Sequence, residues 1–105
     1  MLKKITDVAR VIRSKNCSPF ELTLDIIFEK TSIYEKVKQG NLINAKVIAE
    51  AYGIDEAMIN GIVYFEPAHA VKINLPRPVP SGAPGDTDVY GAQQHAPLLK
   101  LKLQV

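Results

Sequence analysis

The chain has 105 residues, 47% of them hydrophobic and 23% charged, which suits one domain over residues 1–105 with a single core. Its 13 basic and 11 acidic residues are interspersed and leave a net charge of +2, so the clustered basic surface of a nucleic-acid-binding protein is excluded. A lone cysteine excludes an internal disulfide, and no apolar stretch approaches the roughly 18 residues of a membrane span; the sequence therefore predicts a cytoplasmic protein that does not enter a membrane.

The first two expected strands flank a short basic segment. A less regular strand covers about residues 3–11, and a strand at residues 19–28 alternates apolar and polar side chains, as a strand with one buried face does. Between them the sequence RSKNCS predicts a turn that brings cations and small hydrogen-bond donors together. Such a group can bind a carboxylate or phosphate, although a solvated basic turn fits the composition equally well. The candidate anion-binding or partner-binding residues of this turn are Arg13, Ser14, Lys15 and Asn16.

Two helices are expected after the second strand, at residues 31–40 and 44–53. In the first helix, Ser32 and Glu35 have the spacing of a capping box. The second helix has Asn44 as its start signal. Glycine is the usual residue just past the end of a helix. The expected stop signals are Gly40 and Gly53.

Three further strands complete the expected fold. Residues 61–65 are apolar on both faces and suit the centre of a sheet, whereas residues 71–75 and 98–105 each alternate apolar and polar side chains. Strands with one polar face favour an antiparallel sheet with helices on one side only. The sequence therefore predicts an α+β two-layer sandwich, with a mostly antiparallel sheet of about five strands, two helices on one face and a long ordered loop before the last strand.

Residues 77–95 form this proline- and glycine-rich loop. Prolines at alternate positions favour a stiff, extended arm, and three glycines give tight backbone to a dense set of polar side chains. An ordered loop that covers a sheet edge and a binding or active-site loop are both consistent with this composition. The candidate acid and base residues are Asp86, Asp88 and His95, and the candidate ligand-binding or partner-binding residues are Arg77, Ser81, Gly82, Tyr90, Gln93 and Gln94.

The sequence predicts no metal site and no cofactor. Asp86 and Asp88 lack the later glutamate of a calcium-binding loop, and no helix carries the paired histidines of a zinc enzyme. Phosphate-binding and nucleophile-elbow motifs are also absent from the sequence. His69 is expected to be a turn histidine satisfied by the backbone, and Cys17 a small, partly buried thiol.

Three stretches of the sequence resemble a known family. DVARVIRSKNCSPFELTLDIIF, YFEPAHAVKINLPRPVPSG and GDTDVYGAQQHAPLL are similar to small bacterial and archaeal proteins of unknown function, over nearly the whole chain. Those proteins tend to be encoded beside larger acyclic terpene utilisation (AtuA-like) proteins. The first strand and the turn after it also resemble the small ferredoxin-like domain that ends some AtuA-type chains. The resemblance thus implies a ferredoxin-like variant fold and a hetero-oligomer with an AtuA-like large subunit.

The resemblance also implies a function. A small subunit or accessory domain of an AtuA-like complex would act in the catabolism of branched or terpenoid acyl or carboxylic acids. Its loops would complete or cover an active site, and a carboxylate or acyl-CoA substrate would be shared with the partner. The alternatives are a self-sufficient hydro-lyase or isomerase of a carboxylic acid, and a structural domain that forms homo-oligomers. Because an independent enzyme needs a base or nucleophile oriented by a second group, the sequence favours a subunit of a lyase-like or isomerase-like complex over an enzyme acting alone.

Overall fold

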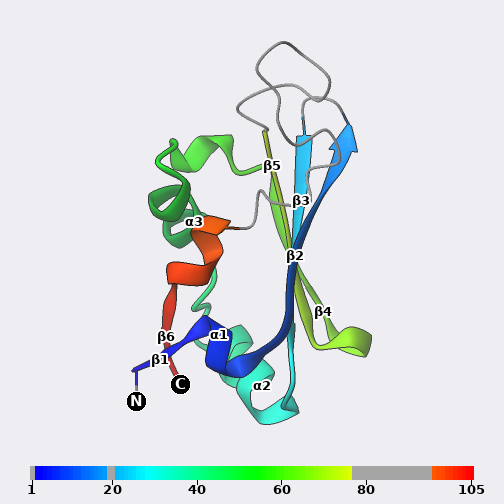
Figure 1. Cartoon of the computed structure of the whole chain (residues 1–105), viewed down its shortest axis with the longest axis vertical. Helices are drawn as coiled ribbons and strands as arrows, with labels where there is room; N and C mark the ends of the chain where they lie inside the picture. Colours follow the sequence, from blue (N-terminus) through cyan, green and yellow to red (C-terminus); the bar gives the residue numbers. More distant parts are fainter. Residues whose placement is uncertain (1, 19–20, 77–95) are drawn as a thin grey trace.

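The computed structural model describes residues 2–18, 21–76 and 96–105, with the backbone alone at residues 16–18 and 96. Within these residues, four strands form a central antiparallel sheet in the order β2-β3-β5-β4 (Figure 1). Hairpin partners lie next to each other in this order, and the pairing of β3 with β5 joins the two hairpins. The strands are β2 Ala9–Ser18, β3 Glu21–Phe28, β4 Gly61–Phe65 and β5 Ala70–Pro76.

The two central strands supply most of the apolar layer beneath the helices. In β3 and β5, every second residue is apolar and almost fully buried, as expected for a strand with one face against a core. Cross-strand neighbours such as Leu24 and Ile73 lie directly opposite each other. The buried residues of this layer are Leu22, Leu24, Ile26, Phe28, Val71, Ile73 and Leu75.

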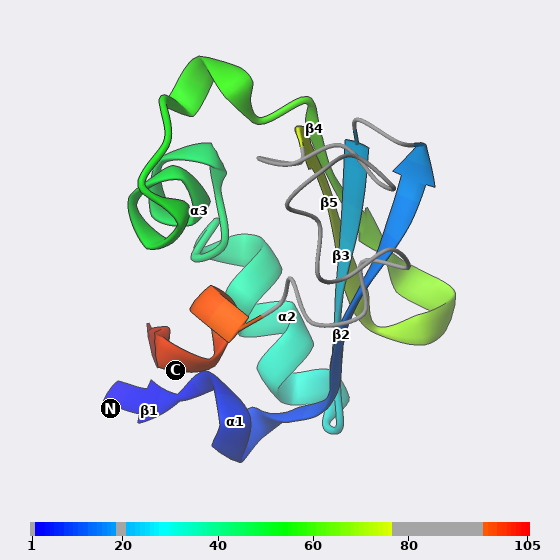
Figure 2. The same cartoon turned by 45° about the horizontal axis from the view of Figure 1, so that its top comes forward.

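The helices lie on one side of the central sheet (Figure 2). They are α1 Ile5–Val8, α2 Thr31–Gln39 and α3 Ala45–Tyr52. In α2, Tyr34 and Val37 are fully buried, and in α3 Ile48 is fully buried, so each helix turns one apolar face to the sheet. The expected α+β two-layer sandwich is therefore confirmed. No helix in the described ranges is both long and apolar enough to cross a membrane.

The expected single sheet of about five strands is instead a four-stranded sheet and a separate two-stranded one. The small sheet pairs β1 (Leu2–Lys4) with β6 (Lys102–Gln104) in antiparallel register. The strand expected at residues 3–11 is interrupted by the single turn of α1, because Ile5 and Val8 have the spacing of one helix face and both are buried. The chain thus enters the central sheet only at Ala9.

The strand expected at residues 98–105 is also shorter than predicted. A 3₁₀ helix, η3 (Ala96–Lys100), occupies its first half. Leu98 is fully buried, whereas Leu99, expected on the buried face, is 42% exposed and Lys100 after it is exposed as well. Burial therefore does not alternate along this half as it would in a strand. The remaining strand β6 buries Leu103 and pairs with β1 rather than with the central sheet.

The strand expected at the centre of the sheet, residues 61–65, is an edge strand. β4 pairs with β5 on one side only within the described residues. One face of β4 packs against the core through Ile62 and Tyr64, whereas Val63 and Phe65 on the other face are 54% and 44% exposed. Within the part of the chain that the structure describes, β4 is thus an apolar edge strand with one exposed face.

The helix ends follow the sequence signals in part. Asn44 caps α3 as expected, because its side chain accepts a hydrogen bond from the Val47 amide at 3.0 Å, and Gly53 ends α3 with a left-handed φ of 65°. The prediction that Ser32 and Glu35 form a capping box is wrong. Since α2 already begins at Thr31 after an extended Lys30, Ser32 lies inside the helix and cannot cap its start.

The remaining turns include two further 3₁₀ helices. The segment after α3 forms η1 (Glu56–Met58), and η2 (Glu66–Ala68) connects β4 to β5. Gly40 follows α2 as expected, but its φ of −83° is open to any residue, and the positive φ nearby falls on Asn41. The segment 77–95, expected to be a long ordered loop, lies outside the described residues.

Candidate functional site

The central sheet has one face that no described helix covers, which we call the open face. Successive side chains of a strand point to opposite faces, and the pairing register therefore places every second residue of each strand on this side. Its cross-strand rows run from polar residues near the start of β3 to apolar residues near its end. The residues of the open face are Val11, Arg13, Lys15, Glu21, Thr23, Asp25, Ile27, Gly61, Val63, Phe65, Ala70, Lys72 and Asn74.

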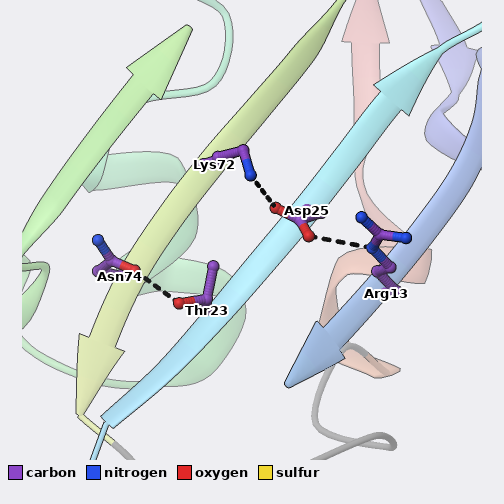
Figure 3. Close-up of polar contacts among 5 residues, drawn as sticks. All are labelled: Arg13, Thr23, Asp25, Lys72 and Asn74. Atoms are coloured by element: carbon purple, nitrogen blue, oxygen red, sulfur yellow. Dashed lines mark hydrogen bonds and ion pairs between the residues drawn. The ribbon is translucent and has the colours of Figure 1, made fainter. Parts of the chain in front are cut away.

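A charged row crosses the middle of the open face. Asp25 on β3 lies opposite Arg13 on β2 and opposite Lys72 on β5. The Arg13 Nε donates a hydrogen bond to Asp25 Oδ2 at 3.0 Å, and the Lys72 Nζ lies 3.8 Å from Asp25 Oδ1 (Figure 3). The short Asp25 side chain thus stands between two longer cationic ones.

Burial separates the three members of this row. Asp25 is only 1% exposed, whereas the side chains of Arg13 and Lys72 are 58% and 42% exposed. The 3.8 Å between Lys72 Nζ and Asp25 Oδ1 is too long for a hydrogen bond, and Oδ1 has no hydrogen-bond partner among the described residues. The negative charge therefore lies beneath the surface, and the two positive charges lie at it.

The row beside the charged one contains a neutral, hydrogen-bonded pair of side chains. Thr23 Oγ1 donates to Asn74 Oδ1 at 2.8 Å, across the same pair of strands (Figure 3). Lys15 lies opposite Thr23 on β2 and is exposed. This cross-strand bond fixes two polar side chains next to the Asp25 row.

Apolar side chains lie at the β4 end of the charged row and in the row after it. Val63 ends the charged row, where it pairs with Lys72, and Phe65 lies in the following row with Ala70. The Lys72 Nζ lies 5.7 Å from the centroid of the Phe65 ring, within the range of a cation–π interaction. Exposed apolar side chains and exposed cations are therefore in contact on the open face.

The expected basic turn is not a turn. Residues 13–16 belong to β2, so the side chains of Arg13, Ser14 and Lys15 alternate between the two faces. Arg13 and Lys15 lie on the open face, but Ser14 pairs with Leu24 and is 6% exposed against the core side. Asn16 lies opposite Leu22 in the register. The structure therefore brings Arg13 and Lys15 to one face of the sheet and places Ser14 on the other.

Two residues of the charged row were not among those expected from the sequence. The alternation of the sequence predicts Asp25 and Lys72 only as polar members of their strands. A usable signal was present for Asp25, because aspartate is depleted in strands and this one stands in the middle of an otherwise regular strand. The remaining candidate site residues, among them Asp86, Asp88 and His95, lie outside the described residues. The others in that segment are Arg77, Ser81, Gly82, Tyr90, Gln93 and Gln94.

An aromatic cluster lies on the helix side, around His69. His69 sits in the turn before β5 with a φ of 51°, and its amide donates to the Glu66 carbonyl at 3.1 Å, so its expected position in a turn is confirmed. Its Nε2 is 3.4 Å from Thr31 Oγ1, and its ring lies 5.5 Å from that of Tyr34. Burial raises the pKa of the Tyr34 hydroxyl, with smaller contributions from nearby Glu35 and Tyr64.

A small cavity lies beside α1 and α2. It has a volume of about 100 Å³, room for a few water molecules. Its lining carries two lysines and two carboxylates, so their charges offset one another. Within the described ranges, no group of three or more metal-ligating side chains occurs, here or elsewhere. The lining residues are Lys3, Asp7, Val8, Glu29, Lys30 and Ile33.

Comparison with known proteins concerns the family alone. No match was found among the curated proteins or among the solved structures. Residues 5–102 match the family described as Domain of unknown function (DUF4387). This match covers the central sheet, the helices α1, α2 and α3, and the charged row of the open face, but not β1 and only the first residue of β6. The chain therefore belongs to the DUF4387 family.

Proposed function

We propose that the protein is a small subunit or accessory domain of a heteromeric complex, and that the open face of its central sheet binds the large subunit. The observation that carries this proposal is the pair of exposed apolar side chains, Val63 and Phe65, at one edge of a sheet face that no described helix covers, with an exposed arginine at the other edge of the same face. Aromatic residues and arginine are enriched at the centres of protein interfaces. The open face combines both.

The architecture supports the same proposal. A two-layer domain has one sheet face against its helices and leaves the other to water or to a partner. On a face that only contacts water, the outward residues of a strand are usually polar, as they are at Thr23 and Asn74. At Val63 and Phe65 they are apolar, which is typical of a surface that another molecule covers.

The identity proposed for the partner is an AtuA-like large protein, and it comes from the sequence resemblance. The complex would act in the cytoplasm, in the catabolism of branched or terpenoid acyl or carboxylic acids. In this proposal the small subunit does not carry out the chemistry alone. Its segment 77–95 completes or covers the active site of the partner, where a carboxylate or acyl-CoA substrate is bound.

Two alternatives to the subunit proposal predict different experimental results. A self-sufficient hydro-lyase or isomerase, with Asp86, Asp88 or His95 as acid and base, would turn over a carboxylic acid without a second protein. A structural domain that associates with itself would form a homo-oligomer in the purified state. Sedimentation of the isolated protein and turnover assays without the large subunit therefore separate both alternatives from the proposed subunit.

The experiment that tests the proposal is co-expression with an AtuA-like large protein, followed by affinity purification through a tag on that protein. Wild-type protein is expected to co-purify in a fixed ratio. Phe65→Glu places a charge in the apolar part of the open face and is expected to weaken binding by about 10-fold or more. The matched control is Met58→Glu, since Met58 is equally exposed, at 46%, but lies in η1 on the helix side.

Three outcomes would count against the proposal. The wild-type protein could fail to co-purify, both variants could bind as well as wild type, or both could lose binding equally. Thermal unfolding of each variant is measured first, so that a loss of binding is scored only for a folded protein.

A further inference from the structure

We infer that Arg13 and Lys72 receive a carboxylate group from an acidic side chain of the protein partner, and that Asp25 is the positioning residue that holds them. This inference rests on the proposed function, because it takes the open face to be the docking surface. It adds the chemistry of the partner: an acidic side chain next to an apolar one.

The geometry of the charged row leaves hydrogen-bond donors at the surface. The Arg13 bond to Asp25 uses Nε, and the paired Nη donors, which suit the two oxygens of a carboxylate, are not part of it. Lys72 lies too far from Asp25 Oδ1 for a hydrogen bond. As far as the described residues go, both cations therefore retain donors for a further acceptor, and each has an exposed side chain.

The charge of the row favours an anion. Two cations share one carboxylate, so the row carries one net positive charge, and the exposed Lys15 of the next row adds another. The negative charge of the row belongs to Asp25, whose side chain is 2% exposed, and the other carboxylate of the open face, Glu21, lies two rows away on β3. An approaching group therefore meets the cations first, and complementary charge both steers and orients such an encounter.

The exposure of the row favours a protein over a small acid. A carboxylate paired with a solvent-exposed arginine gains only about 0–1 kcal/mol, which is too little to hold a free acid at ordinary concentrations. A protein that also covers Val63 and Phe65 excludes water from the neighbouring charged row. Ion pairs strengthen when water is excluded, so apolar cover and charge recognition reinforce each other here.

The first test measures the affinity of the purified complex and its dependence on salt. Arg13→Gln is expected to raise the dissociation constant by about 10-fold or more and to flatten its salt dependence. Lys46→Gln is the matched control, because it removes one exposed positive charge from α3 on the helix side; it is expected to change the constant by less than about threefold. An Arg13→Gln protein with wild-type affinity and salt dependence would overturn the inference.

The second test asks whether the variant Asp25→Asn binds the partner more tightly or more weakly than wild type. Asp25→Asn makes the open face more positive, so charge alone predicts tighter binding to an acidic partner. If Asp25 positions the two cations, the variant binds more weakly despite the added net charge. The NMR signal of the Arg13 Nε–H group reports the same property, and in the variant it is expected to move toward that of a free arginine. Tighter binding by Asp25→Asn would show that Asp25 is not a positioning residue.

The third test does not need the large subunit. The peptide acetyl-Phe-Glu-Phe-amide is titrated into labelled wild-type protein, with acetyl-Phe-Gln-Phe-amide as its uncharged match and acetate as a small free acid. The acidic peptide is expected to shift the Arg13 Nε–H signal at least about fivefold more than either of the others at equal concentration. Equal shifts from both peptides would overturn the carboxylate contact, and a stronger effect of acetate would assign the site to a small acid instead of a protein.

These tests fail in different ways. If the large subunit does not bind the wild-type protein, the proposed function is wrong, and the peptide titration still decides the carboxylate contact. If the large subunit binds but Arg13→Gln has no effect, the proposed function stands and the inference is wrong.

Discussion

Two tyrosines of the same aromatic cluster differ in what their hydroxyl groups contact. The rings of Tyr34 and Tyr64 meet edge to face, with centroids 6.2 Å apart. The Tyr64 hydroxyl donates to the Ile43 carbonyl at 3.0 Å. The Tyr34 hydroxyl is buried and has no hydrogen-bond partner among the described residues. A buried hydroxyl without a partner loses its hydrogen bonds to water and gains nothing in return.

Replacement of each tyrosine by phenylalanine therefore has opposite expected effects. Tyr34→Phe is expected to raise the free energy of unfolding by up to about 1 kcal/mol, because it removes an unsatisfied hydroxyl and keeps the ring. Tyr64→Phe is expected to lower it by about 1 kcal/mol, because it leaves the Ile43 carbonyl without its donor. Urea unfolding of both variants measures the difference. Destabilisation by Tyr34→Phe as large as that by Tyr64→Phe would mean that the Tyr34 hydroxyl has a partner.

At the scale of the elements, the starts of α2 and α3 differ in whether a side chain caps the first turn. Asn44 lies at the N-cap of α3 and accepts from the Val47 amide, while its own amide donates to the Asn41 carbonyl at 2.9 Å. The N-cap of α2 is Lys30, which makes no side-chain capping bond. The helix start with the weaker sequence motif is thus the one with a side-chain cap.

This difference gives a matched pair of alanine variants. Asn44→Ala removes a capping bond and is expected to lower the free energy of unfolding by about 1 kcal/mol. Ser32→Ala is expected to stay within about 0.5 kcal/mol of wild type, since Ser32 is exposed inside α2 and caps nothing. Thermal or urea unfolding checks both. If Ser32→Ala lowered the free energy of unfolding as much as Asn44→Ala, Ser32 would cap α2 as the sequence predicted.

The elements also show what the sequence could predict. Alternation identified β3 and β5 and the correct buried face of each, because both strands lie at the sheet centre with one face on the core. It misassigned β4, since a strand that is apolar on both faces can be central or can meet a partner at an edge. The single turn of α1 is too short to leave a clear period of its own.

The candidate site was predicted only in part, because the sequence shows neighbours along the chain but not neighbours across the sheet. Arg13 and Lys15 were identified, because a cluster of cations is visible in the sequence. Their separation from Ser14 depends on whether the segment is a turn or a strand, which the register of β2 against β3 decides. The contribution of Asp25 depends on which residues lie beside it on β2 and β5, and such cross-strand neighbours are far apart in the chain.

At the scale of the whole molecule, the layers meet around tyrosines. Tyr34 comes from α2, Tyr52 from α3 and Tyr64 from β4, so the helices and the sheet each contribute one to the contact between layers. Burial raises the pKa of all three above the ordinary value of 10.0, most clearly for Tyr52. At Tyr64 the bond to Ile43 opposes part of this rise. The stability of the two-layer fold is therefore linked to pH in the alkaline range.

The sign of this link follows from the two states of the chain. Above about pH 10 the tyrosines of the unfolded chain ionise, while those of the folded chain remain protonated until the pH reaches their higher pKa. The free energy of unfolding is thus expected to be steady below pH 10 in respect of these groups and to fall above it. Each such tyrosine contributes a slope of at most about 1.4 kcal/mol per pH unit. Tyr34→Phe removes one of these tyrosines, so its free energy of unfolding is expected to fall less steeply above pH 10 than that of wild type. Urea unfolding from pH 8 to pH 12 measures both slopes. Identical slopes in the two proteins would show that Tyr34 ionises as readily in the folded chain as in the unfolded one.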